Sequence, residues 1–111
     1  MLPQGTSGGT LATLANGLTV TGDCISLPAV GVAVKTSSKS ETLELFGHRV
    51  NGTETFFVED FNATGYGVSD KSNVGLEGIA RDANVGKFAH IVVSGRVGSP
   101  CTYWGMIIPS G

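Results

Sequence analysis

Alternation of apolar with small or polar positions is the clearest pattern in this chain. Apolar residues occupy every second position in 30–34 and again in 89–93. A period of two places such residues on one face of a β-strand. Threonine and valine favour a further strand over 18–21, and a last apolar run covers 101–108. The pattern therefore predicts an all-β domain, either a small β-barrel or a β-sandwich.

A hairpin is expected in the middle of the sequence. Asn51 and Gly52 form a turn pair between two segments of strand-like composition, 41–50 and 53–61. Asn-Gly is the strongest short hairpin indicator because both residues tolerate a left-handed backbone. A helix over the first segment is the alternative, since a capping-box pattern begins at Ser38. The alternation within that segment favours the strand.

Glycine and polar residues indicate where strands should be interrupted. Gly22 and Asp23 predict a bulge after the strand at 18–21, and the glycine-rich stretch 62–73 predicts a loop. A polar corner separates 78–80 from 87–94, so these two segments are expected to form another antiparallel pair.

The chain length predicts one β domain preceded by an arm. At 111 residues the sequence can close a single core, which we assign to 18–111. Residues 1–17 are rich in glycine, serine and threonine and too short for a stable isolated helix. They predict an extended arm that is either disordered or ordered on a neighbouring subunit. Its leucines, Leu2, Leu11 and Leu14, favour the second alternative.

The composition shows an unusual shortage of charge. Only 14% of the residues are charged while 41% are hydrophobic, and 17 are glycine. Soluble domains typically contain about 25% charged residues. The shortage suggests that part of the surface is covered by other chains, which predicts a component of an assembly. The alternative is a glycine- and threonine-rich domain whose surface is polar without being charged.

The charge balance and the hydropathy pattern exclude two classes of partner. The net charge is −2 and the isoelectric point is about 5.5, so we expect no grip on nucleic acid phosphates. Runs free of glycine and proline are shorter than a membrane span, and the first residues do not resemble a secretory signal. We therefore expect no membrane partner and synthesis in the cytosol.

Two cysteines are too few for a disulfide scaffold. Cys24 and Cys101 lie in apolar, strand-like stretches and lack the paired spacing of a zinc site. We expect each to be a reduced, buried small hydrophobe. A mutual disulfide that joins the two ends of the chain is the alternative.

No motif supports catalysis. Residues 5–9 formally match a nucleophile elbow around Ser7, but no buried strand precedes them. Cys24 and His48 do not have the spacing of a thiol and its base, and the cysteines and histidines form no local chelating pair. We expect a protein that is not an enzyme and has no metal or cofactor.

Residues 75–97 carry a resemblance to a known class of proteins. The segment contains Gly78-Ile79-Ala80, a small-residue turn, a valine-rich return strand, and Gly95-Arg96-Val97. It resembles the closing segment of the small β-rich capsid decoration proteins of tailed phages, also called cement or head-stabilising proteins.

The resemblance implies a function and a location. Such proteins are small barrels or sandwiches on the outside of the phage head, often trimers, that clamp neighbouring major capsid subunits. This chain would then be assembled in the host cytoplasm and reside in the virion, with the major capsid protein and its own copies as partners. Residues 1–17 would be the arm that reaches across a seam, with Leu2, Leu11 and Leu14 facing the capsid.

The C-terminal apolar run supplies further candidate interface residues. Tyr103, Trp104 and Met106 are candidate anchors because aromatic residues and methionine are enriched in buried interfaces. Core packing is the alternative for all three. The alternative function is a carbohydrate- or receptor-binding module of a viral tail or head fibre, which would expose aromatics such as Tyr66 and Trp104 over a polar shelf.

Overall fold

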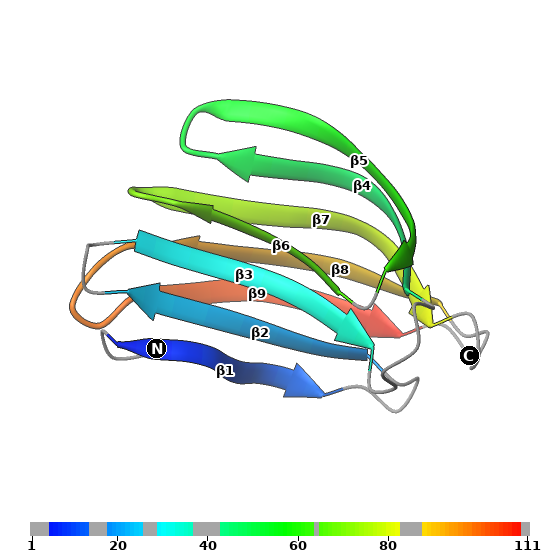
Figure 1. The fold of residues 1–111 in the computed structure, drawn as a ribbon, viewed down its shortest axis with the longest axis horizontal. Coiled ribbons are helices and arrows are strands. Elements are labelled where there is room, and N and C mark those ends of the chain that lie inside the picture. The colour runs from blue at the N-terminus through cyan, green and yellow to red at the C-terminus, as the bar shows by residue number, and fades with distance from the viewer. Residues whose placement is uncertain are drawn as a thin grey trace.

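The protein is all-β, as the alternation predicts. The computed structural model describes residues 5–13, 18–25, 29–36, 43–63, 65–82 and 88–109. Within these residues it contains nine β-strands and no helix. The strands form two antiparallel sheets that pack against each other (Figure 1).

One sheet has four strands in the order β1-β2-β3-β6. These strands are β1 (Thr6–Thr13), β2 (Leu18–Ile25), β3 (Ala29–Thr36) and β6 (Gly65–Asp70). β2 and β3 pair without interruption from Leu18↔Thr36 to Ile25↔Ala29. β1 pairs less regularly, with two shifts of register against β2.

The second sheet has five strands in the order β5-β4-β7-β8-β9. These strands are β4 (Leu43–Asn51), β5 (Glu54–Ala63), β7 (Asn73–Asp82), β8 (Phe88–Arg96) and β9 (Thr102–Pro109). β4 and β5 form the hairpin expected at Asn51-Gly52, where Gly52 has a φ of 61°. β7 and β8 form the other expected pair.

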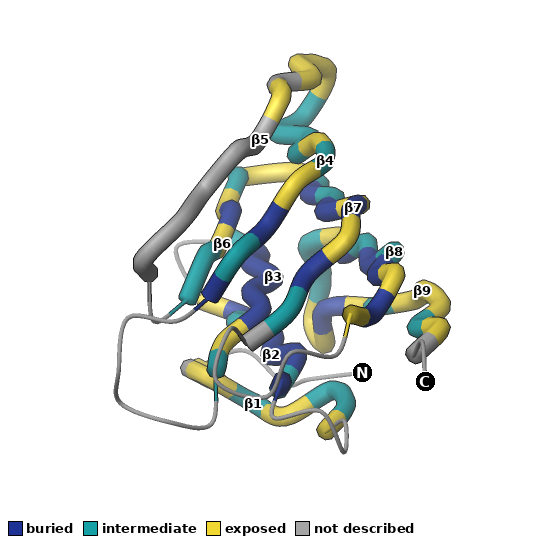
Figure 2. The backbone as a smooth tube through the Cα atoms, turned by 90° about the vertical axis from the view of Figure 1, so that its right-hand side faces the viewer, coloured by how far each residue is buried: buried dark blue, intermediate teal, exposed yellow. Residues whose placement is uncertain are grey.

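The core lies between the two sheets and follows the period-two pattern. Leu18, Val20, Val30, Val32 and Val34 of the four-stranded sheet are at most 1% exposed. The facing residues of the five-stranded sheet include Leu43, Leu45, Leu76, Ala80 and Ile91. Buried positions alternate with more exposed ones along β8, whereas β3 is buried at every position from Val30 to Val34 (Figure 2). The architecture is a sandwich and not a closed barrel.

Three local expectations need correction or completion. Gly22 and Asp23 do not interrupt β2, because both continue its ladder with β3. The stretch 62–73 is not a loop, since β6 lies within it and pairs with β3. Its glycines leave room for this close approach, because a Cβ on Gly65 would lie 3.3 Å from the Val34 carbonyl oxygen. Of the expected arm, Thr6–Thr13 forms β1 at the edge of a sheet.

Candidate functional site

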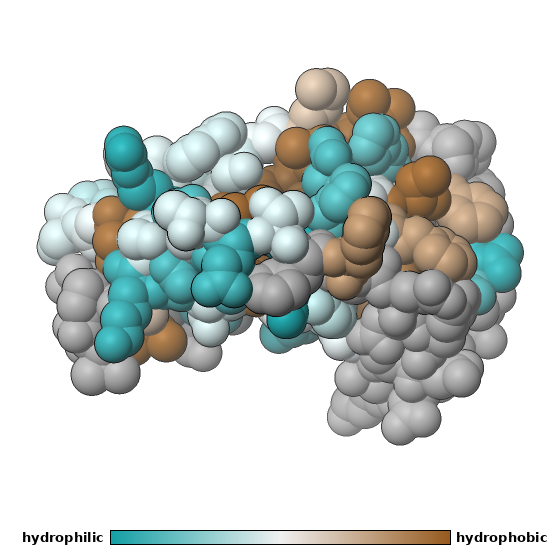
Figure 3. Space-filling view, turned by 90° about the horizontal axis from the view of Figure 1, so that it is seen from above, coloured by the Kyte–Doolittle hydropathy of each residue, from teal (hydrophilic) through white to brown (hydrophobic). Residues whose placement is uncertain are grey.

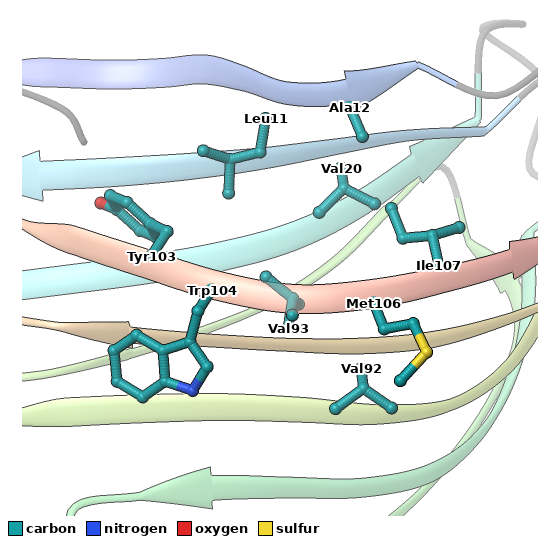
Figure 4. Close-up of a pocket in the computed structure, with 10 residues that line it drawn as sticks. Leu11, Ala12, Val20, Val92, Val93, Tyr103, Trp104, Met106 and Ile107 are labelled. Carbon is teal, nitrogen blue, oxygen red and sulfur yellow. The ribbon is translucent and has the colours of Figure 1, made fainter.

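β9 presents different side chains to its two sides. Tyr103 and Ile107 pack against the core, whereas Trp104, Met106 and Ile108 are 54%, 60% and 53% exposed. Figure 4 shows Tyr103 and Ile107 directed toward β1 and β2, and Trp104 and Met106 directed away from them. The alternation of the strand therefore places three large apolar side chains on the outside of the five-stranded sheet.

The register extends this exposed surface across the whole sheet, because residues paired across strands stand on the same face. One row consists of Phe57, His48, Glu77, Val92 and Met106. The next row consists of Phe46, Ile79, His90 and Ile108. A third row consists of Val50, Gly75, Ser94 and Trp104. We call these three rows the outer face.

Apolar side chains dominate the outer face. Phe57 is 90% exposed, and Ile79 on the central strand β7 is 49% exposed. Polar groups beside them contact one another within the sheet: Arg81 forms an ion pair with Glu44, and Glu77 Oε1 lies 3.7 Å from Nδ1 of His48. Figure 3 looks along the sheets from above, and in that view apolar side chains are more numerous in the right half and hydrophilic ones in the left half.

A hollow lies beside Trp104 on the outer face. It has a volume of about 690 Å³, and its polar lining includes Ser94, Asn73 and Arg96. A second hollow, of about 340 Å³, shares Val50, Gly75 and Ser94 with the first. Gly75, which has no side chain, and Ser94 thus line both hollows, and the exposed Trp104 also lines the first.

The sandwich is open along the seam between β1 and β9. A cavity of about 290 Å³ lies there, lined by Leu11 and Ala12 of β1 and by Tyr103 and Ile107 of β9, among others. Leu11 and Ala12 are half-buried and point across the seam (Figure 4). At this seam the apolar interior of the protein reaches the surface.

A covalent bond joins the two sheets near one end of β9. Cys24 of β2 and Cys101 form a disulfide with a Cα–Cα distance of 5.8 Å, and both residues are fully buried. The expectation of two reduced thiols was therefore wrong. Each cysteine does pack as a buried hydrophobe, but folding places them opposite each other across the sandwich, which the sequence separation of 77 residues concealed.

A hydrogen bond reinforces this junction. The Tyr103 hydroxyl donates to the Asp23 carbonyl oxygen at 2.6 Å, next to the disulfide. Burial raises the pKa of the Tyr103 phenol above its usual value near 10, and the negative charge of Asp23 adds to the effect. Tyr103 is thus held neutral as a donor that connects β9 to β2.

The structure places the six candidate interface residues in different environments. Leu2 and Leu14 lie outside the described residues. Leu11 packs against the core at the seam, and Tyr103 also packs against the core. Trp104 and Met106 lie on the outer face.

Sequence reasoning missed the residues that complete this surface. Phe57, Ile79 and Ile108 were not candidates, because only the register of the strands shows that they share a face. Tyr66, proposed as a partner of Trp104, packs against the core, and its hydroxyl accepts a hydrogen bond from Arg49.

The described residues hold no cluster of three or more histidine, cysteine or acidic side chains that could bind a metal ion. Nor does the described part of the chain contain a helix of the length and apolarity needed to span a membrane. Cys24 is not a free thiol, since it is bonded to Cys101.

Comparison with protein-family models, with curated proteins and with solved structures found no match.

Proposed function

We propose that the protein is a virion structural protein of the capsid decoration class, which binds the outer surface of the major capsid lattice and stabilises the head. The observation that carries the proposal is the outer face. Contiguous exposed apolar side chains on a small domain indicate a surface that another protein covers. Trp104, Met106, Ile108 and Ile79 supply the large apolar groups that interfaces use as anchors.

The distribution of charge also supports docking on protein. On the outer side of the sheet Arg81 already forms an ion pair with Glu44, so a partner that covers these two side chains does not leave either charge without a counter-ion. Specific interfaces typically bury about 800 Å² on each partner. The broad face of a sheet can supply a contact area of this size, which a narrow cleft could not. Repetition over a lattice would then convert a modest contact into resistance of the head to disruption.

The disulfide supports a location on the exterior of a particle. Disulfides persist in oxidising surroundings, among them virion surfaces, and are rare in cytosolic proteins. A chain synthesised in the cytoplasm and then exposed on a released virion would complete its Cys24–Cys101 bond at that stage.

Binding to capsids tests the proposal. Undecorated heads from a phage that encodes this chain are mixed with the purified protein, sedimented, and heated to measure the disruption temperature. We expect the protein to co-sediment and to raise that temperature. Ile79→Lys places a charge in the centre of the outer face and should weaken co-sedimentation at least about tenfold.

The matched control places the same charge on the opposite sheet. Ser69 is exposed on β6 of the four-stranded sheet, so Ser69→Lys should bind heads as the unaltered protein does. Loss of binding in both variants, or in neither, would contradict docking through the outer face. Absence of binding by the unaltered protein would reject the decoration function itself.

A second candidate function follows from the hollow beside Trp104. An exposed indole beside polar groups such as Ser94 and Asn73 can stack on a sugar ring, and Arg96 could pair with an acidic group. The chain would then be a carbohydrate-binding module of a viral tail or head fibre. A glycan array with hits that disappear in Trp104→Ala would favour this function, and an array without hits would reject it.

A further inference from the structure

One positively charged side chain lines the hollow beside Trp104. Among the described residues around this hollow, Arg96 is the only charged one. Its side chain is exposed, and no acidic group in the described part of the chain lies within ion-pair distance of it, whereas Arg81 is paired with Glu44. The net charge of the whole chain is −2, so attraction of an anion to this hollow comes from Arg96 itself. The hollow therefore favours a ligand that carries an acidic group.

Arg96 and Trp104 lie on the same side of the sheet at a separation that suits one sugar ring. Trp104 pairs with Ser94, and Arg96 lies two residues beyond Ser94 on β8, which makes it a diagonal neighbour of Trp104. Diagonal neighbours on two paired strands are about 7–8 Å apart. A ring stacked on the exposed indole can therefore direct a carboxylate at the guanidinium, whose N–H groups match the two carboxylate oxygens. Ser94 and Asn73 supply polar partners for the sugar hydroxyls.

The second hollow continues this site across the sheet toward β4. The two hollows share Val50, Gly75 and Ser94 as lining residues. A Cβ on Gly75 would lie 3.5 Å from Val50 Cβ and 3.7 Å from the Ser94 hydroxyl oxygen, so the glycine leaves the space between these two side chains open. The volumes of about 690 and 340 Å³ both fall within the range of about 300–1,000 Å³ that is usual for ligand sites. A ligand longer than one ring can thus occupy both hollows.

The charge at the far end of the second hollow has the opposite sign. Glu77 lines this end, and its side chain is 53% exposed, with one carboxylate oxygen 3.7 Å from His48 Nδ1. A negative charge there repels a second acidic sugar. The two hollows therefore suit an acidic sugar at the Arg96 end and a neutral sugar at the Glu77 end.

We infer that the two hollows together bind a short oligosaccharide that ends in a carboxylated sugar, with the acidic sugar between Trp104 and Arg96 and a neutral sugar beside Glu77. The inference rests on carbohydrate binding, the second function proposed for the chain, and adds the class of sugar and its direction across the sheet. Since both hollows lie on the outer face, a copy docked on a head through that face would not hold the ligand at the same time.

The fluorescence of Trp104 measures binding directly, because it is the only tryptophan of the chain. The full chain is titrated with sialyllactose, with lactose, and with a trimer of sialic acid. The first two probes are the same neutral disaccharide with and without a carboxylated sugar. We expect the dissociation constant for sialyllactose to be at least about tenfold lower than that for either other probe. High salt should reduce the advantage over lactose, since it screens exposed charges.

Three variants assign the effect to individual charges. Arg96→Gln should raise the dissociation constant for sialyllactose at least about tenfold and leave that for lactose unchanged. Lys35→Gln removes the same charge from the four-stranded sheet, where Lys35 is exposed on β3, and should change neither constant. Glu77→Gln should lower the constant for the sialic acid trimer. All three residues are exposed, so equal melting temperatures would show that the variants keep the fold.

Equal affinity for lactose and sialyllactose, or an advantage that persists in Arg96→Gln, would overturn the inference. So would tight binding of the sialic acid trimer that Glu77→Gln leaves unchanged, or absence of binding to all three probes. The glycan array judges the carbohydrate function separately, because neutral hits that disappear in Trp104→Ala would support that function while contradicting the acidic sugar.

Discussion

Tyr103 of β9 contributes to the contact between the two sheets in two ways. Its ring packs against the core, and its hydroxyl donates to the Asp23 carbonyl oxygen across the sandwich. Both depend on the phenol staying neutral. The raised pKa of this group means that the folded protein holds the phenolic proton more tightly than the unfolded chain does.

Replacing Tyr103 with phenylalanine tests this role. We expect Tyr103→Phe to lower the free energy of unfolding by about 1 kcal/mol at pH 8, because one hydrogen bond between the sheets is lost. Tyr103 contributes fully below about pH 10, and its contribution is lost as pH rises through the higher folded pKa.

Urea unfolding at pH 8 and at pH 11 measures both effects. The unaltered protein should lose more stability between the two pH values than Tyr103→Phe does, because the other basic and phenolic groups are common to both. An equal loss in the two proteins would contradict the assignment of the shift to Tyr103.

Glycines set how closely the central strands β4 and β7 approach. Gly47 and Gly78 stand opposite each other in this pair. A Cβ on Gly78 would lie 2.1 Å from the Phe46 carbonyl oxygen, and one on Gly47 would lie 1.9 Å from that of Glu77. These carbonyl oxygens belong to the backbone and cannot move aside as the end of a flexible side chain can. The pairing of β4 with β7 therefore requires residues without a Cβ at positions 47 and 78.

We therefore expect Gly78→Ala to destabilise the protein by about 1–3 kcal/mol, as overpacked sites do. Gly75 lies on the same strand, but a Cβ there would lie 3.5 Å from Val50 Cβ, which is ordinary contact. Gly75→Ala is thus the control and should be nearly neutral. Thermal unfolding of both variants decides the matter, and equal shifts in melting temperature would contradict the close-approach explanation.

The sequence predicts individual strands and hairpins better than it predicts which strands pair with each other in a sheet. The alternation in 30–34 and the Asn51-Gly52 pair are local features, and β3 and the β4–β5 hairpin follow them. β6 escaped prediction because Gly65 and Gly67 resemble a loop, whereas their lack of side chains lets the strand lie close to β3. Only tertiary pairing distinguishes the two cases.

The candidate site was predictable only in part for the same reason. The composition of β9 made Trp104 and Met106 candidate anchors, and both lie exposed on the outer face. Ile79 and Phe57 lie on the same face as these residues only because of how the strands of the five-stranded sheet pair with one another. No local sequence pattern specifies that pairing. The disulfide likewise depends on two segments that meet only in the folded sandwich.

The two sheets of the molecule are held together by apolar packing and, besides the connections of the chain itself, by a disulfide. The disulfide joins β2 to the residue before β9, and the chain between the cysteines contains six of the nine described strands, β3 to β8, besides the last residue of β2. Closing a loop of this length restricts the unfolded chain strongly. Chain-entropy arguments give about 4 kcal/mol of stabilisation for a separation of 77 residues.

Reduction should therefore weaken the protein far more than a surface change would. We expect the reduced protein and the double variant Cys24→Ala/Cys101→Ala to lose about 4 kcal/mol of unfolding free energy relative to the oxidised protein. Urea unfolding of the three forms measures the loss, and the double variant controls for effects of the reductant. Both cysteines should resist alkylation in denaturant unless a reductant is present.

The same comparison also tests the proposed decoration function. If the oxidised form is much more stable, a chain that leaves the reducing cytoplasm gains rigidity when it reaches oxidising surroundings, and the gain falls at the junction beside β9. Heads decorated with oxidised protein should then withstand higher temperature than heads decorated with the double variant at equal occupancy. Equal disruption temperatures would show that the disulfide stabilises the domain but does not contribute to the stability of the head.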